Sequence, residues 1–149
     1  MVTELDKAYL AGFIDGEGCI VVSSFSNKNA KSRSYRSMLI ISQGIESPMK
    51  RLRDLWGVGH IICQKNTGFG NSPKYVWNIY SKDAYYVLSQ VLPYLVIKKV
   101  QAEKILELQK HIDIHRSNKP LSPDILKYRE DIKDSISRLN QTRELYLDS

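Results

Sequence analysis

The sequence predicts an α+β domain in which a four-stranded antiparallel sheet carries helices on one of its faces. Pairs of β-branched segments are separated by helix-periodic segments, in the order helix, two strands, helix, two strands, helices. Strand pairs that alternate with helices favour an antiparallel sheet covered on one side. The length of 149 residues and the 42% hydrophobic content suit one globular domain. We therefore expect a single domain over residues 1–149, with a core at 1–116 and a C-terminal helical segment at 117–149.

The strands are predicted from short runs rich in valine, isoleucine and tyrosine that end at polar or glycine-containing turns. They cover residues 18–27, 35–43, 60–65 and 74–80. The first two runs form a hairpin with a long basic tip, and the last two are joined by a turn-rich segment. Cys19 and Cys63 lie in these runs, form no CxxC pair and are expected to be free thiols.

Apolar residues at helical spacing predict the helices. They cover residues 5–15, 47–57, 83–92, 97–112 and 124–139. In the second helix we expect Ser47 as N-cap, Pro48 at the first helical position and Gly57 at the end. The fourth counts Val100, Ile105 and Leu108 among its apolar positions. The last presents one face made of Ile125, Tyr128, Ile132, Ile136 and Leu139.

The net charge of +6 favours an anionic partner, most commonly nucleic acid. No apolar run is long enough to cross a bilayer, so no membrane association is expected. The first residues have no basic, apolar and small-residue succession, so we expect no targeting peptide. The protein is then expected in the compartment of its synthesis, either an organelle such as the chloroplast or a prokaryotic cytoplasm.

The stretch YLAGFIDGEGCI at residues 9–20 combines helical periodicity with three glycines and two acids. Each helical glycine costs roughly 0.5–1 kcal/mol relative to alanine. Ala8, Gly12 and Gly16 lie four residues apart, so they form a smooth strip that another backbone can approach closely. Asp15 and Glu17 oppose the macrodipole where the helix ends, which suggests a bound cation. A short core helix that ends at Gly16 or Gly18 is the simpler alternative.

Residues 10–18, LAGFIDGEG, resemble the LAGLIDADG motif of homing endonucleases. Further similar segments are Ser42-Gln43, WGVGHI, LPYLVIKKVQAEKIL and SPD…LNQTR. The motif occurs once, as in the homodimeric, intron-encoded members whose targets lie in ribosomal RNA genes. The resemblance implies a curved DNA-binding sheet and a motif helix at the dimer interface. That interface is then expected to contain Ala8, Tyr9, Gly12, Phe13, Asp15 and Gly16.

The resemblance also implies the catalytic roles. Glu17 corresponds to the acid that coordinates a divalent metal, and the Gly16 carbonyl is expected near that metal. Mg²⁺ is the expected ion, with Mn²⁺ or Ca²⁺ able to occupy the site, and no small-molecule cofactor is expected. Asp15 corresponds to a mainly structural acid. Lys98 is expected to stabilise charge or orient water, and Gln43 to position solvent.

One position departs from the family pattern. Members often carry a further basic residue one helical turn after the glutamine, and here that position is Ser47. Lys50 or Arg51 could substitute for it, although both are equally plausible as solvated helix charges. His111 and His115 have helical spacing but no second ligand pair, so we interpret the histidines as surface residues or phosphate contacts.

Strand alternation assigns the side chains that read DNA. Ile20, Val22, Leu39, Ile41, Ile61, Cys63, Tyr75, Trp77 and Ile79 are predicted to face the helices. The opposite, DNA-binding face is predicted to contain Cys19, Val21, Ser23, Phe25, Asn27, Ser34, Arg36, Met38, Ile40, Ser42, His60, Ile62, Gln64, Lys74, Val76, Asn78 and Tyr80. Phosphate contacts are predicted from Lys28, Lys31, Arg33, Lys65, Lys74, Lys98, Lys99, Lys119, Asn140 and Arg143, each of which is individually more typical of a solubilising residue.

The sequence thus predicts a homodimeric, site-specific endonuclease that cuts double-stranded DNA at a long near-palindromic site and promotes intron mobility. An intron maturase, or a non-cleaving nucleic-acid-binding protein on the same scaffold, is the first alternative. An unrelated basic α+β domain with a chance motif is the second.

Overall fold

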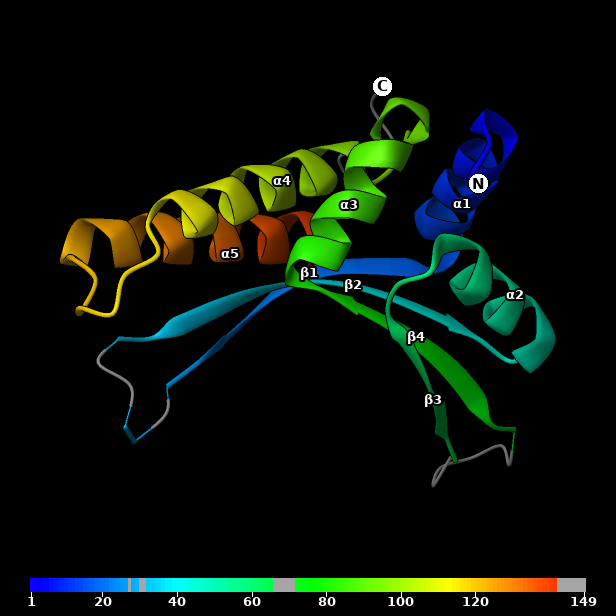
Figure 1. Cartoon of the computed structure of the whole chain (residues 1–149), viewed down its shortest axis with the longest axis horizontal. Coiled ribbons are helices and arrows are strands. Elements are labelled where there is room, and N and C mark those ends of the chain that lie inside the picture. The colour runs from blue at the N-terminus through cyan, green and yellow to red at the C-terminus, as the bar shows by residue number, and fades with distance from the viewer. Residues whose placement is uncertain (27, 30–31, 66–71, 142–149) are drawn as a thin grey trace.

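The architecture is described by a computed structural model over residues 1–26, 28–29, 32–65 and 72–141. The elements follow in the order α1 (Glu4–Glu17), β1 (Gly18–Phe25), β2 (Ser34–Gln43), α2 (Glu46–Trp56), β3 (His60–Gln64), β4 (Lys74–Tyr80), α3 (Ser81–Val91), the short 3-10 helix η1 (Leu92–Tyr94), α4 (Lys99–Ile114) and α5 (Pro123–Gln141). Figure 1 shows them in colour from the N-terminus to the C-terminus. The predicted order of helices and strands is confirmed.

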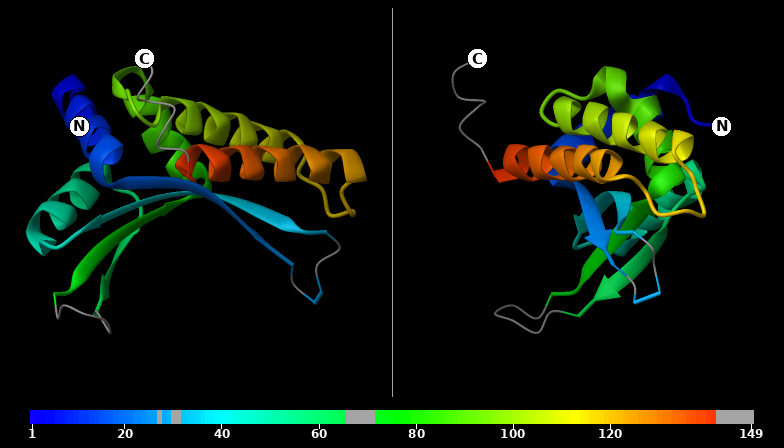
Figure 2. Two further views of the ribbon diagram at one scale, coloured as in Figure 1. Left: turned by 180° about the vertical axis from the view of Figure 1, so that it is seen from behind. Right: turned by 90° about the vertical axis from the view of Figure 1, so that its left-hand side faces the viewer.

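The four strands form one antiparallel sheet in the order β1-β2-β4-β3. The sheet is strongly curved, and the left view in Figure 2 shows the helices on its convex side while the concave side stays open. Gly18 pairs with Ile41 across β1 and β2, and Ile41 pairs with Trp77 across β2 and β4. The predicted α+β fold, a curved four-stranded antiparallel sheet with helices on one face, is therefore confirmed.

The core lies between the convex face of the sheet and the helices. The inward residues Ile20, Leu39, Ile41, Trp77 and Ile79 are fully buried, as strand alternation predicts. Trp77 donates its indole N–H to the carbonyl of Val58 at 3.0 Å. Gly59 has a φ of +76°, and a Cβ there would lie 2.6 Å from the Asn78 carbonyl oxygen, so only glycine fits where the chain enters β3.

Some local predictions are wrong. The N-cap of α2 is Ile45 rather than Ser47, and Pro48 is the third helical residue rather than the first, because the helix begins at Glu46. Val100 is 47% exposed in the first turn of α4. Cys63 is exposed, although Ile61 on the same strand packs against the core. Both free thiols are confirmed.

The start of α1 carries a capping box that the sequence prediction missed. The Thr3 hydroxyl accepts the Asp6 N–H, and the Asp6 carboxylate accepts the Thr3 N–H. Such reciprocal bonds satisfy two of the free amides at a helix start. In the described ranges, no helix combines the length and the apolar character that crossing a bilayer demands.

Candidate active site and nucleic-acid interface

The motif helix α1 runs into β1 without a loop. Glu17 is the last helical residue and Gly18 the first strand residue. A Cβ on Gly18 would lie 2.8 Å from the Ile14 carbonyl oxygen, so the turn requires glycine at this close approach. The turn brings the acidic end of α1 against the first strand of the sheet.

Asp15 binds the segment that leads into α4. Its carboxylate accepts hydrogen bonds from the backbone N–H groups of Val96 at 2.9 Å, Ile97 at 3.1 Å and Lys98 at 2.9 Å. A carboxylate beside the amides at a helix start is stabilising. The Asp15 carboxylate thus forms its hydrogen bonds within its own chain. These bonds suit the predicted structural role, and the place of Asp15 in a dimer interface stays a prediction.

The side chain of Lys98 in turn binds the backbone at the end of α1. Its ammonium group donates to the carbonyls of Ile14 and Asp15, both at 2.9 Å, at the C-terminal end of α1. The Ile14 carbonyl also accepts the Gly18 N–H. Burial lowers the pKa of Lys98, and the nearby Asp15, Cys19 and Glu17 act in the opposite direction. Lys98 is therefore placed at the end of α1 with a partly desolvated charge.

Glu17 is exposed at the same end of α1. Its charge acts on Lys98, so the predicted metal-binding acid and the lysine predicted to stabilise charge or orient water lie near each other. Gly16, the other predicted metal ligand, is also exposed, and a Cβ there would meet nothing within 4 Å. An exposed carboxylate suits a hard cation that keeps several waters and also binds phosphate oxygens.

The described residues contain no group of three or more histidine, cysteine, aspartate or glutamate side chains arranged to hold a metal ion. Glu17 and the Gly16 carbonyl are thus the predicted protein ligands among the described residues, and water or substrate phosphates would complete the coordination. This donor set fits Mg²⁺, which commonly binds one or two protein carboxylates together with substrate phosphates.

Gln43 ends β2, as predicted, and is half-buried. Its side-chain carbonyl accepts the Gly44 N–H at 2.7 Å. That bond leaves the amide NH₂ group of Gln43 as a donor. Of the two candidates for the missing basic residue, Lys50 forms an ion pair with Glu46 at 2.7 Å. Arg51 instead lines a groove between α1 and α2 together with Tyr9.

The open side of α1 contains the predicted small-residue strip. Ala8, Gly12 and Gly16 are exposed, and a Cβ at either glycine meets no other atom within 4 Å. Tyr9 is 60% exposed beside the strip and stacks on Phe13 with ring centroids 6.3 Å apart. A strip of small residues flanked by Tyr9 is thus available for close packing.

The concave face of the sheet contains an aromatic and cationic cluster. The guanidinium of Arg36 lies 4.3 Å from the ring centroid of Tyr80 and 6.0 Å from that of Phe25. His60 lies 5.5 Å from Tyr80, ring centroid to ring centroid. A guanidinium at this distance from a tyrosine ring makes a favourable cation–π contact. All four residues were predicted to lie on this face.

Other predicted contacts differ in accessibility. Cys19, Phe25, His60, Ile62, Gln64 and Lys74 are exposed, and Val21, Ser23, Ser34, Arg36, Met38, Ile40, Ser42 and Tyr80 are intermediate. Val76 and Asn78 are 5% and 7% exposed, because neighbouring strands flank them on both sides, so they offer little surface to a partner. Lys28, Arg33, Lys65, Lys99 and Lys119 are exposed.

Asn140 forms hydrogen bonds within the chain. Its side chain donates to the Ile20 carbonyl at 2.8 Å and accepts from Gln101 at 3.5 Å, which links α5 to β1 and α4. The residue is exposed, and its phosphate contact stays a prediction. Asn27, Lys31 and Arg143 lie outside the described residues.

The sequence prediction missed the amides of Val96 and Ile97 and the carbonyl of Ile14. These are backbone groups, so the identity of the residue at each position does not indicate the hydrogen bond that it forms. The sequence offers one signal of this contact, which is an acid at the end of the motif, Asp15, and a lysine just before a later helix, Lys98. That signal is useful only if the two segments are already known to lie side by side.

Comparisons with known proteins agree with this geometry. The family model described as LAGLIDADG endonuclease matches residues 10–115. The chain belongs to the LAGLIDADG endonuclease family. A relative from Neurospora crassa, "Probable intron-encoded endonuclease 4", is 27% identical over 142 residues, which cover 88% of this chain and 24% of that protein. The chain thus spans about a quarter of the length of this curated relative.

Two solved structures have the same fold. The homing endonuclease I-CvuI in complex with a DNA target has a TM-score of 0.78 and 23% identity, covering 95% of this chain and 85% of that one. The archaeal intron-encoded homing endonuclease I-Vdi141I complexed with DNA has a TM-score of 0.74 and 18% identity, covering 91% and 84%. The predicted fold and family membership are confirmed.

Proposed function

We propose that this chain is a homodimeric, divalent-metal-dependent DNA endonuclease that cuts both strands of a specific site. The placement of Glu17 carries the proposal. This exposed carboxylate ends the motif helix beside Lys98, at the junction of the helix with a curved sheet whose concave face is open. I-CvuI and I-Vdi141I, which share the fold, are described as homing endonucleases in complex with DNA.

The concave face supplies the DNA-binding surface in this proposal. Its cation and rings suit phosphate and base contacts, and its apolar members suit thymine methyl groups in a major groove. A strand of about nine residues spans roughly 30 Å, which covers about nine base pairs. A dimer would therefore contact roughly two helical turns of a near-palindromic site.

Hydrolysis requires a positioned water and neutralisation of the charge that develops on the phosphate. Glu17 and the Gly16 carbonyl would hold a divalent cation, which when bound supplies charge neutralisation at the scissile phosphate. Lys98 lies close enough to share that task, because the α1 carbonyls hold its ammonium group at the helix end. The amide of Gln43 would orient solvent.

The dimer follows from the open strip on α1. Two motif helices packed through Ala8, Gly12 and Gly16 would place one Glu17 from each chain near a common axis. One acid per chain then serves one DNA strand, which suits a symmetric double-strand cut.

The test is digestion of the intronless allele of the gene that hosts this reading frame. The purified chain is expected to cut it once in the presence of Mg²⁺ and not in EDTA. Glu17→Gln should retain binding in a gel-shift assay and lose cleavage. Cutting by Glu17→Gln at the unmodified rate would refute the assignment, and binding with no cutting by the unmodified chain would favour a non-cleaving protein.

A further inference from the structure

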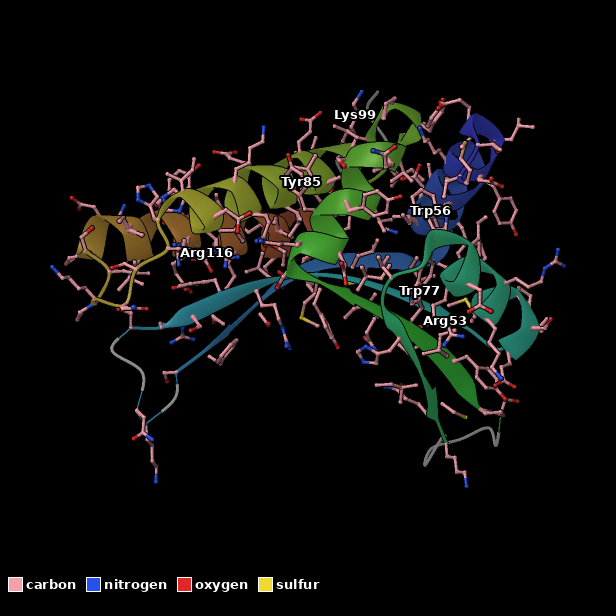
Figure 3. The ribbon with its side chains drawn as sticks, in the orientation of Figure 1. Arg53, Trp56, Trp77, Tyr85, Lys99 and Arg116 are labelled. Atoms are coloured by element: carbon pink, nitrogen blue, oxygen red, sulfur yellow. The ribbon has the colours of Figure 1, made fainter. Side chains whose placement is uncertain are left out.

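A second cationic site lies at the far end of the molecule from α2. A hollow of about 630 Å³ opens between the start of β2, the end of α4 and the connection into α5. Arg33, Arg116, Lys119, Arg129 and His115 line it, and no aspartate or glutamate is among its described lining residues. In Figure 3 the labelled Arg116 marks this end, and Arg53 on α2 marks the opposite end.

Arg129 is the unusual member of this group. It is 5% exposed, whereas Arg33, Arg116 and Lys119 are exposed. Its Nε donates to Nδ1 of His111 at 3.4 Å. Within the described part of the chain, no carboxylate oxygen lies within 4 Å of its guanidinium. A buried charge without an opposite charge is costly, so such a group normally has a partner.

The acids near this site have other partners. Glu130 follows Arg129 on α5, but it accepts hydrogen bonds from the Tyr35 hydroxyl at 2.6 Å and from Lys133 at 3.2 Å. Asp113 forms an ion pair with Arg116 at 3.0 Å on the exposed rim. Neither carboxylate compensates the guanidinium of Arg129, which leaves an excess of positive charge around the hollow.

Hydrogen bonds to three serine hydroxyls fix the wall of the hollow. The Ser32 hydroxyl accepts the Leu121 N–H at 2.8 Å, which fastens the α4–α5 connection to the start of β2. The Ser117 hydroxyl accepts the Lys119 N–H at 3.0 Å and shapes the connection itself. Arg33 donates to the Ser24 hydroxyl at 2.8 Å, which holds its guanidinium on β1 and β2.

We propose that this hollow is a binding site for a phosphate-class oxyanion, with Arg129 as its buried ligand and Arg33, Arg116 and Lys119 around its rim. Guanidinium groups bind phosphate oxygens through paired, charge-assisted hydrogen bonds. The oxyanion supplies the opposite charge that the buried guanidinium lacks. Two sources share this chemistry, which are the backbone of a bound duplex and free phosphate in solution.

The test is an NMR titration of the full chain with sodium phosphate, at ionic strength held constant with sodium chloride. The Nε–H signal of Arg129 and the amides of Ser117, Lys119 and Leu121 are expected to shift and saturate. Absence of a saturable shift, or equal shifts in chloride alone, would overturn the proposal.

Substitutions in the hollow, compared with one on α2, test whether phosphate binds at this site. Arg129→Met is expected to weaken phosphate binding about tenfold, the loss typical of a charge-assisted hydrogen bond. Because that buried change could impair folding, the exposed pair Arg116→Gln with Lys119→Gln is made as well and is expected to weaken binding several-fold. Arg53→Gln is the matched control, since Arg53 also forms an ion pair with a single aspartate, at 2.7 Å. Equal weakening in the control would overturn the assignment.

A second titration distinguishes the two sources of the oxyanion. The titration is repeated with a saturating duplex from the intronless allele. Loss of the phosphate-induced shifts assigns the site to a backbone phosphate, and retained shifts assign it to free phosphate. Both outcomes support the oxyanion site, and neither depends on cleavage, so failure of the endonuclease proposal would leave this result standing.

Discussion

Asp15 and Lys98 bind each other's backbone across the junction between α1 and α4. The Asp15 carboxylate accepts the Lys98 N–H at 2.9 Å, and the Lys98 ammonium donates to the Asp15 carbonyl at 2.9 Å. Each side chain satisfies backbone groups that a helix end leaves without partners. The pair therefore fixes the end of the motif helix, and with it the position of Glu17.

Asp15→Asn is expected to destabilise the fold by about 1–3 kcal/mol, because an amide cannot accept three N–H bonds as a carboxylate does. The free energy of unfolding from urea denaturation measures the effect. Asp134→Asn, an exposed position on α5, is the control and is expected to change stability little. Equal stability of the two variants would contradict the structural role of Asp15.

The open strip on α1 predicts opposite effects on folding and on assembly. Gly12→Leu adds a side chain where a Cβ meets nothing within the chain, so the fold should tolerate it and gain helix propensity. In a dimer packed through this strip, the same side chain would collide with the partner helix. Sedimentation velocity should show dimers of the unmodified chain and monomers of Gly12→Leu.

Lys110→Leu is the matched control for this prediction, because it adds the same apolar side chain to an exposed position on another helix, α4. It is expected to leave the dimer intact. Dimers of Gly12→Leu at the same concentration as the unmodified chain would show that assembly uses a different surface.

His111 predicts a dependence of stability on pH. Burial, the neighbouring His115 and the Arg129 guanidinium hold the pKa of His111 below its usual value. As the pH falls through the ordinary histidine range, the unfolded chain takes up this proton before the folded chain does. The folded state is therefore stable above that range and loses stability as the pH falls toward the lowered pKa.

His111→Gln should reduce this loss between about pH 7.5 and 5.5, the window in which an ordinary histidine titrates. Urea denaturation at the two pH values measures it. His60→Gln, which removes an exposed histidine on the concave face, is measured alongside for comparison. An unchanged slope in His111→Gln would contradict the prediction.

The sequence predicted most of the fold because its periodicities are local. Strand alternation correctly placed Ile20, Leu39 and Trp77 in the core, and Gly57 ends α2 in a left-handed conformation as expected. The cap of α2 was wrong because Ser47 has the right chemistry but lies inside a helix that starts at Glu46. The exposure of Cys63 depends on how far the helices extend over β3, and no local pattern encodes that.

The candidate site was predicted only in part for the same reason. Glu17, Gln43 and Lys98 were named through the family resemblance, and the structure brings Glu17 and Lys98 together. The three amides that hold Asp15, and the burial of Arg129, arise from contacts between residues far apart in sequence. Backbone groups and burial have no signature in residue identity, so sequence reasoning could not find them.

Arg36 is predicted to read one base pair within the proposed DNA site. Its guanidinium lies 4.3 Å from the centroid of the Tyr80 ring on the concave face. Within the described residues its buried Nε has no hydrogen-bond partner, and neither has the hydroxyl of Ser23, which pairs with it across the strands. A guanidinium that is positioned by the Tyr80 ring and still has N–H donors available suits a bidentate contact to guanine.

Arg36→Ala should relax discrimination at one position of each half-site by about 1–3 kcal/mol and leave the other positions unchanged. Tyr80→Phe keeps the ring and should behave as the unmodified chain, whereas Tyr80→Leu should weaken the same position as Arg36→Ala. Arg143→Ala, at a predicted phosphate contact, should instead weaken binding to all sequences. Binding-site selection with each variant measures this. If Arg36→Ala weakened every sequence equally, its contact would be to the DNA backbone, and the assigned reading face would be wrong at that strand.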